Sequence, residues 1–329
     1  MLLGLAALVL VPALPAPVLP VFAPVGQPLV LVVTLLAAMS LVAWWQGGRL
    51  LPALGWVGVA VWILAQPIPG TPGYAPLVRG WALLLAGVFG LFCVLRPRRA
   101  LLEQALPAVG VALALGTLVL LTGASALGSE LARTMEGEYG ARASDAVAWL
   151  QRLATSPEWT AVARDNPEAA ELRAQLQAQL VASYTGMPGR SLVVLPAMLA
   201  LESLAALAVA WGLHHRLGRV RIGPPPAPLR AFSFSDQLIW GLIVGITAVV
   251  LPALAEVRPA GANLLVFFGA LYVVRGLGVL SWLLRARRWT KVTLVAVGLL
   301  AWQLLAAFAL ALGVGDTWLD WRSRTRPTS

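Results

Sequence analysis

Long apolar runs, each close to 20 residues and separated by short arginine clusters, dominate this sequence and limit what it can fold into. A helix of about 20 apolar residues crosses the ~30 Å hydrocarbon layer of a bilayer. Inside that layer each backbone amide and carbonyl must be bonded within the protein, so such runs form helices. We therefore expect an all-α, polytopic helical membrane protein with about nine transmembrane helices. The expected spans are residues 2–22, 27–46, 50–66, 77–95, 105–125, 191–213, 237–255, 263–284 and 292–313.

The composition excludes a soluble globular protein. The 329 residues are 59% hydrophobic and 12% charged, whereas soluble domains carry about 25% charged residues. The single cysteine, Cys93, lies inside an apolar run, so neither a disulfide nor a cysteine metal cluster is available. The first run, residues 2–22, follows no basic segment and contains four prolines. We expect a retained, irregular span or a half-span there rather than a cleaved signal peptide.

Basic residues gather on one side of the expected bundle. Twelve cations and only two acids fall in the loops near residues 49, 96–103, 214–236 and 285–291. The positive-inside rule places these loops in the cytoplasm of a bacterial inner membrane. The N-terminus is then cytoplasmic and the C-terminus extracytoplasmic. Three arginines in the tail, Arg322, Arg324 and Arg326, run against this orientation.

Residues 126–190 differ in kind from the rest of the chain, because they hold eight acids, six arginines and no long apolar run. Ser-Pro-Glu at 156–158 and Asn-Pro-Glu at 166–168 are typical of helix starts. Leucines recur every four residues from Leu172 to Leu180, which indicates one apolar helix face. We predict an extracytoplasmic insert of two or three short helices over the outer mouth of the bundle, with its acids on ordinary solvated faces.

A proline-rich stretch at residues 223–228 (GPPPAP) is typical of a stiff, extended linker. It separates a first block of six spans from a closing block of three. The predicted parts are residues 1–125 with spans one to five, the insert 126–190, span six at 191–222, the cytoplasmic linker 223–235, and residues 236–329 with spans seven to nine and the tail.

No catalytic residue, cofactor site or metal site is expected. The chain has no phosphate-binding loop and its only lysine is Lys291, so it is not an ATPase by itself. Adjacent helical residues point about 100° apart, so His214 and His215 are poorly placed to bind one metal, and we expect them at the membrane interface. The cations form no basic helix face and no aromatic-interleaved patch, which argues against a nucleic-acid partner.

Two charges interrupt the apolar spans. Glu202 lies in span 191–213 and Arg275 in span 263–284. Ions inside a membrane are costly and usually face a partner, water or substrate. Both residues are expected near the same depth, so we predict a mutual ion pair. Whether that pair only sets the helix register or forms part of a functional site stays open.

The segment after the last expected span has a distinct composition. Tryptophans at a span end anchor it at the interface between membrane and water. We therefore expect a cap on the outer membrane surface, with the motif residues Asp316, Trp318, Asp320, Trp321 and Arg322.

Residues 271–279 (LYVVRGLGV) and 315–322 (GDTWLDWR) together resemble the YybS-like family of predicted bacterial membrane proteins, domain-of-unknown-function family 2232. In that family a span carries an aromatic-rich run ending in a Gly-Leu-like pair, and a Gly-x-x-Asp-x-Trp-x-Asp-aromatic-Arg-like signature follows the last span. The resemblance extends over residues 230–322. Arg275 stands where the family pattern has an uncharged polar residue, so no role is carried over to it.

The hydropathy of that family is similar to that of the substrate-binding subunits of energy-coupling-factor transporters. This resemblance implies a solute-binding transport component that works with a partner membrane subunit and ATPases. Residues 2–22 lack the Ala-x-x-x-Ala docking signature of those subunits, and the insert is additional. The alternative is a membrane scaffold or envelope assembly factor whose external insert docks a partner. An enzyme is disfavoured because no nucleophile–base or metal arrangement is present. The lipid bilayer is a partner under either hypothesis.

Overall fold

The computed structural model describes residues 23–122, 126–155, 171, 174–175, 178–179, 181–182, 187–218, 220–283 and 302–319. Over these residues the fold is all-helical and contains no strand, which confirms the predicted class. The chain forms two compact units that divide between Pro225 and Pro226. We call them the N-terminal unit and the C-terminal unit.

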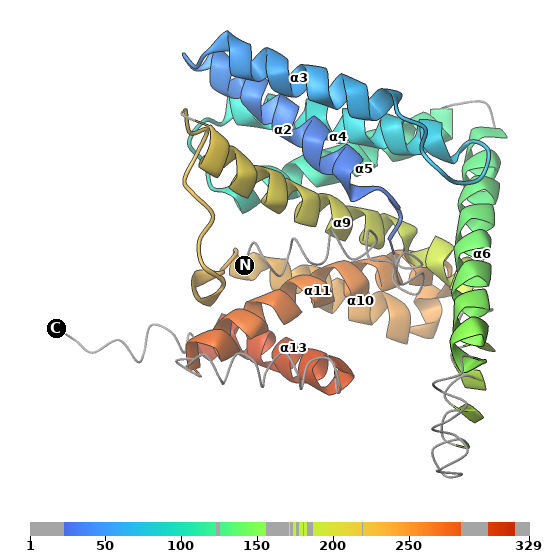
Figure 1. The fold of residues 1–329 in the computed structure, drawn as a ribbon. Helices are drawn as coiled ribbons and strands as arrows, with labels where there is room; N and C mark the ends of the chain where they lie inside the picture. The colour runs from blue at the N-terminus through green and yellow to red at the C-terminus, as the bar shows by residue number, and fades with distance from the viewer. Residues whose placement is uncertain are drawn as a thin grey trace. The chain divides into compact units, whose positions relative to one another are not determined.

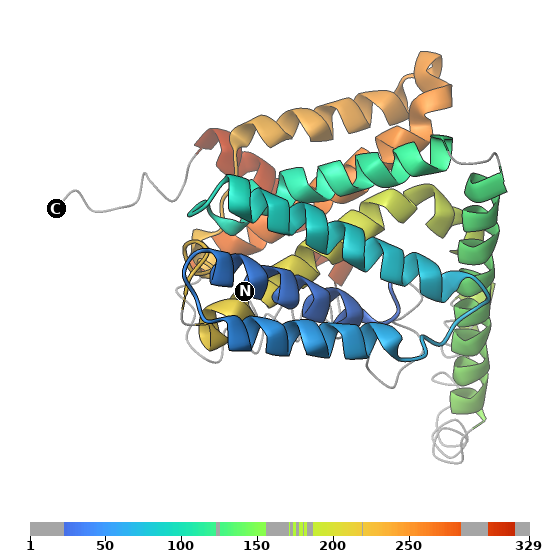
Figure 2. The same ribbon diagram turned by 90° about the horizontal axis from the view of Figure 1, so that it is seen from above.

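The helices described in the N-terminal unit are α2 (Pro28–Trp45), α3 (Leu50–Ala65), α4 (Tyr74–Leu95), α5 (Leu101–Thr122), α6 (Ala126–Ala154) and α9 (Met187–Leu217). Helix α2 packs against α3, α4 and α9, while α5 packs against α4 and α9. In both ribbon views α2, α3, α4, α5 and α9 run roughly side by side (Figures 1 and 2).

Prolines and glycines set the ends of these helices. Pro28 occupies the first turn of α2, where its missing amide hydrogen costs no helical hydrogen bond. Helix α4 ends just before Pro97, a residue whose ring disfavours a helical conformation at the position before it. The loop 66–73 between α3 and α4 holds three prolines, together with Gly70 and Gly73 at positive φ. This loop turns the chain back within eight residues.

Helix α6 crosses one end of the N-terminal unit. In both views it runs transverse to α2–α5 and α9, beside the loop that joins α3 to α4 (Figures 1 and 2). Its buried face repeats at helical spacing through Met135, Tyr139, Ala143 and Ala146. We predicted two or three short helices in the insert. This prediction is wrong for its first part, which is one helix of 29 residues. The proposed helix starts at 156–158 and 166–168 lie outside the described residues.

The first residues of the linker fold back on the end of α9. His214 Nε2 lies 3.1 Å from the carbonyl oxygen of Val220, and His215 Nε2 lies 2.9 Å from that of Gly223. Trp211 Nε1 donates to the carbonyl oxygen of Pro224 at 3.0 Å. His215 and Trp211 therefore hold the first two residues of the linker within the N-terminal unit, and His214 holds the backbone just before them.

The C-terminal unit contains α10 (Ile239–Val250), α11 (Arg258–Leu283) and α13 (Trp302–Leu319), with short 3₁₀ turns η3 (Leu229–Ala231), η4 (Asp236–Leu238) and η5 (Pro252–Val257). Helix α11 packs against both α10 and α13. Pro252 follows the end of α10, and the 3₁₀ turn that it begins leads into α11.

Helix α13 ends later than expected. The last span was predicted to stop at residue 313, but the helix continues to Leu319. Glycine weakens a helix interior by about 0.5–1 kcal/mol, so Gly313 and Gly315 are unfavourable residues within α13. Packing outweighs this effect, because Gly313 meets Gly276 of α11 and a Cβ at Gly313 would lie 2.0 Å from the carbonyl oxygen of Tyr272.

Five described helical segments are long and apolar enough to cross a membrane, namely Pro28–Trp45, Tyr74–Leu95, Leu101–Thr122, Gly189–Leu217 and Pro252–Leu283. Leu50–Ala65, Asp236–Val250 and Leu304–Leu319 are shorter apolar helices. The described residues therefore do not reach the predicted count of nine spans. Large apolar side chains such as Leu51 and Trp62 are exposed on α3, as expected for a helix in contact with lipid.

Candidate functional site

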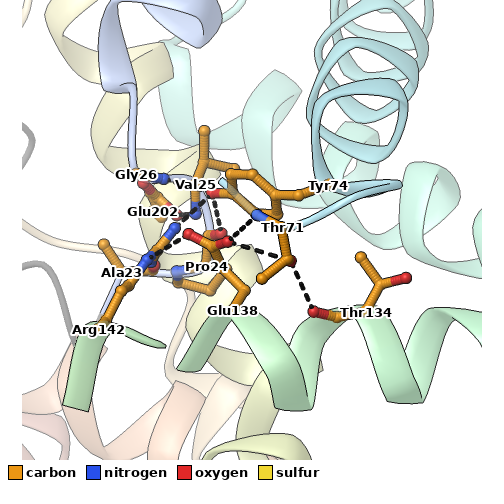
Figure 3. Close-up of polar contacts among 10 residues, drawn as sticks. All are labelled: Ala23, Pro24, Val25, Gly26, Thr71, Tyr74, Thr134, Glu138, Arg142 and Glu202. Atoms are coloured by element: carbon orange, nitrogen blue, oxygen red, sulfur yellow. Dashed lines mark hydrogen bonds and ion pairs between the residues drawn. The ribbon is translucent and has the colours of Figure 1, made fainter. Parts of the chain in front are cut away.

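A polar cluster lies between α6 and the neighbouring helices of the N-terminal unit (Figure 3). It consists of backbone atoms of residues 23–26, with the side chains of Thr71, Tyr74, Glu138, Arg142 and Glu202. We call this set the α6 cluster. Glu138 and Arg142 come from α6, Tyr74 begins α4, and Glu202 comes from α9.

Arg142 is the cation of the α6 cluster. Its Nε donates to Glu138 Oε1 at 2.9 Å, one Nη donates to the Tyr74 hydroxyl at 2.7 Å, and the other donates to the carbonyl oxygen of Ala23. Burial lowers the pKa of Arg142, but its contacts with Tyr74 and Glu138 outweigh this effect and raise the pKa above its ordinary value. Arg142 therefore stays charged and ties α6 to the segment before α2.

Glu138 joins α6 to the loop between α3 and α4. Its Oε2 accepts from the backbone amide of Thr71 at 2.8 Å and lies 3.2 Å from the Thr71 hydroxyl. Gly70, at φ +150°, comes so close that a Cβ there would lie 2.8 Å from Glu138 Oε2 and 2.6 Å from Tyr74 Cδ1. A larger residue at position 70 would therefore displace this carboxylate.

The Tyr74 hydroxyl is fully used within the α6 cluster. It accepts from the Gly26 amide at 2.7 Å and from Arg142, and it donates to the carbonyl oxygen of Pro24 at 2.8 Å. These contacts seat the segment 23–26 against the start of α4. Nearby Tyr139 is also buried, and burial raises the pKa of its phenol, so Tyr139 is neutral.

Glu202 is the least satisfied member of the α6 cluster. Its side chain comes from an apolar helix and the residue is only 8% exposed. Glu202 Oε2 accepts from the Val25 amide at 2.8 Å. Its other oxygen, Oε1, is buried and has no hydrogen-bond partner among the described residues. A buried, half-bonded carboxylate is costly, so it is the feature of the site that most needs a functional explanation.

A second polar centre lies within the C-terminal unit, around Arg275 of α11. Arg275 Nε donates to Asp316 Oδ2 at 2.9 Å, and Arg275 Nη1 donates to Asp236 Oδ1 at 2.7 Å. The Phe234 ring lies 5.3 Å from the guanidinium carbon, within range of a cation–π contact. Arg275 and Asp316 are buried, whereas the side chain of Asp236 is 61% exposed. Two carboxylates therefore compensate one buried cation.

Glu202 and Arg275, which were expected to pair with each other, lie in different units. Each has its contacts within its own unit, Glu202 with the Val25 amide and Arg275 with Asp236 and Asp316. The ion pair between Glu202 and Arg275 stays a prediction. We predicted that the acids of the insert lie on solvated helix faces. This prediction is wrong for Glu138, because that residue is 5% exposed.

The motif at the end of the last helix is only partly described. Asp316, expected in the cap on the membrane surface, is 1% exposed and bonded to Arg275, because α13 continues past it and packs on α11. Trp318 is exposed. Asp320, Trp321 and Arg322 lie outside the described residues.

Sequence reasoning missed several site residues. Glu138 and Arg142 are four apart on one helix, a spacing that favours an ion pair. This spacing is visible in the sequence, but it does not distinguish a buried ion pair from a solvated one. Tyr74 and Asp236 gave no signal, because their roles depend on segments distant in sequence.

Comparison with known proteins gives one family. Residues 161–317 match the model of a family described as a predicted membrane protein (DUF2232). The match covers slightly less than half of the chain. It includes Glu202, Asp236, Arg275 and Asp316 and leaves out the Glu138–Arg142 pair of α6. Neither the curated proteins nor the solved structures yield a match. The match and the apolar helices agree on a membrane protein and assign it no activity.

Proposed function

We propose that this chain is a non-enzymatic, solute-binding protein of the bacterial inner membrane and that its α6 cluster receives the solute. The observation that carries the proposal is Glu202, a buried carboxylate on an apolar helix with Oε1 unbonded among the described residues. Ionisable groups within membrane helices are costly and commonly mark paths for substrates or ions.

The construction of the α6 cluster suits a site that opens and closes. One side of Glu202 is covered by the segment 23–26, whose backbone forms hydrogen bonds with Tyr74, Arg142 and Glu202. Those same donors and acceptors become available to a polar solute if the segment moves. Bonds of this kind exchange at a small net cost, about 0.5–1.5 kcal/mol each.

The proposed orientation follows the positive-inside rule. Arg49, Arg96, Arg98 and Arg99 lie in the loops at the ends of α2 and α4 that are remote from the α6 cluster along those helices, and we place these loops in the cytoplasm. The α6 cluster then faces outward, and the N-terminus faces inward. A nine-span arrangement that uses residues 2–22 as the first span belongs to the same proposal.

The resemblance to substrate-binding subunits of energy-coupling-factor transporters supports a division of labour. This chain, which has no phosphate-binding loop, would bind the solute. A partner membrane subunit and its ATPases would supply the energy for release. The family match is compatible with this role and does not distinguish it from others.

A second candidate function is a membrane scaffold or envelope assembly factor. The observation that favours it is the bonding of Arg142, whose donors are occupied by Glu138, Tyr74 and Ala23. A clamp bonded in this way also suits a permanent platform, with the exposed face of α6 docking a partner protein.

The two functions are separated by purifying the full chain in native lipid and identifying bound small molecules by mass spectrometry. We compare wild type, Glu202→Gln and the control Glu130→Gln, which neutralises an exposed acid of α6. A solute-binding protein retains a small molecule in wild type and in the control and loses it in Glu202→Gln. A protein partner held equally by all three, with no small molecule, would overturn the proposal in favour of the scaffold.

A further inference from the structure

The α6 cluster carries a charge imbalance. It contains two carboxyl groups, Glu138 and Glu202, and one guanidinium, Arg142. Glu138 is paired directly with Arg142 at 2.9 Å. If Glu202 were ionised, the buried cluster would hold one uncompensated negative charge. Such a charge in a poorly solvated position is very costly, and the usual remedy is neutralisation.

Among the described residues, the elements packed against Glu202 supply no cation besides Arg142. Helix α9 packs against α2, α5 and α6. Helix α2 and the segment 23–27 contain no titratable side chain, and the one ionisable residue of α5, Glu103, is exposed and paired with Arg99. From α6 the nearby groups are Glu138, Tyr139 and Arg142, and from α4 the nearby group is Tyr74. Arg142 is the one cation among them, and it already compensates Glu138.

We propose that Glu202 is a proton-binding site, with the proton held on Oε1 while the α6 cluster is closed. Oε1 is shielded from solvent and has no partner among the described residues, so a proton can bind there without any rearrangement, whereas a metal ion or an ammonium group needs added space. The proton comes from water and converts the carboxylate to a neutral carboxyl. The Val25 amide can still donate to Oε2.

This assignment adds a coupling ion to the proposed function. When the segment 23–26 and α6 move away, water reaches Glu202 and the carboxyl releases its proton to water. When they return, the carboxyl takes a proton up again. Closure of the α6 cluster and proton binding therefore occur together, whatever solute is bound.

The test follows thermal unfolding of the full chain in lipid nanodiscs between about pH 5.5 and about pH 8.5. A group that holds a proton only in the folded state makes stability fall as the pH rises, by up to about tenfold in the folded-to-unfolded ratio per pH unit. Wild type and the control Glu130→Gln should show this fall. Glu202→Gln, which stays neutral, should lose it and match wild type at the acid end.

A second outcome of the same measurement contradicts the proposal. If Glu202 is ionised in the folded protein across this pH range, Glu202→Gln keeps the pH slope of wild type, which would overturn the proposal. Infrared spectroscopy of wild type labelled with ¹³C-glutamate gives a second readout that needs no variant. A protonated-carboxyl band from glutamate is expected at neutral pH, because the other described glutamates are exposed or, for Glu138, paired with Arg142. Absence of that band also overturns the proposal.

The two proposals fail separately. A wild-type protein that binds no small molecule but shows the pH slope, lost in Glu202→Gln, contradicts the solute-binding function and supports the proton site. A bound solute that depends on Glu202, without the slope or the band, does the reverse.

Discussion

The guanidinium Nε of Arg275 lies 2.9 Å from Oδ2 of Asp316, and this buried ion pair joins α11 to the last turn of α13. The same guanidinium contacts Asp236, three residues before α10 begins. Within the C-terminal unit, the end of α13 therefore lies beside the start of α10. The expected topology had put the linker before α10 and the C-terminus on opposite sides of the membrane.

We therefore predict that the C-terminus lies on the same side as the linker, as an alternative to the extracytoplasmic position expected from the spans. In a Cys93→Ala background, a cysteine at Ser233 and a C-terminal tag should be protected together from impermeant reagents in whole cells, while a cysteine at Ser144 is labelled. A tag that is accessible while Ser233→Cys is protected would refute the shared side.

This placement also explains the arginines of the tail. Arg322, Arg324 and Arg326 contradicted the positive-inside rule when the C-terminus was expected outside. On the cytoplasmic side they follow it, together with the arginines of the linker.

The Arg275 centre should respond non-additively to mutation. Arg275→Gln or Asp316→Asn each leaves a buried charge without its main partner, and we expect a loss of about 3–5 kcal/mol. The double variant should lose less than the sum of the two. Asp236→Asn is the control, because its exposed pair is expected to contribute about 0–1 kcal/mol. Unfolding in detergent measures all four variants, and additive losses would contradict a direct pair.

The α6 clamp should depend on Glu138 and not on its neighbour two residues earlier. Glu138→Gln weakens the ion pair with Arg142 and the bonds to Thr71, so we expect a loss of about 1–3 kcal/mol. Hydrogen–deuterium exchange should rise at residues 23–27 and 66–73. Glu136→Gln removes an exposed acid of the same helix and should change neither quantity. Equal exchange in both variants would show that Glu138 does not hold these segments.

The contact between α11 and α13 should tolerate no side chain at Gly276. A Cβ there would lie 1.7 Å from the carbonyl oxygen of Ala309, so Gly276→Ala must push the helices apart and should cost about 1–3 kcal/mol or more. Gly269→Ala, in the same helix, meets no atom within 4 Å and should be neutral or slightly stabilising. Thermal unfolding of the two variants compares them directly, and similar melting temperatures would argue against this close helix contact.

Sequence by itself determined the all-helical class and the position of most helices. The bounds expected for α2 and α3 agree with the structure to within one residue. A run of apolar residues bounded by proline, glycine and arginine is a local signal, and in a membrane the need to bond the backbone internally makes helix its outcome.

Tertiary structure alone decided which polar residues matter. Glu136 and Glu138 are the same residue type on one helix, yet only Glu138 is buried, because only its side of α6 meets the loop at Thr71. Arg275 finds its partners 39 and 41 residues away, and neither charge pattern nor hydropathy encodes such distances. Glycine is unfavourable inside a helix, but Gly313 lies within α13 at the point where α13 contacts α11. Close packing, which depends on both helices at once, overrides a local preference of about 1 kcal/mol.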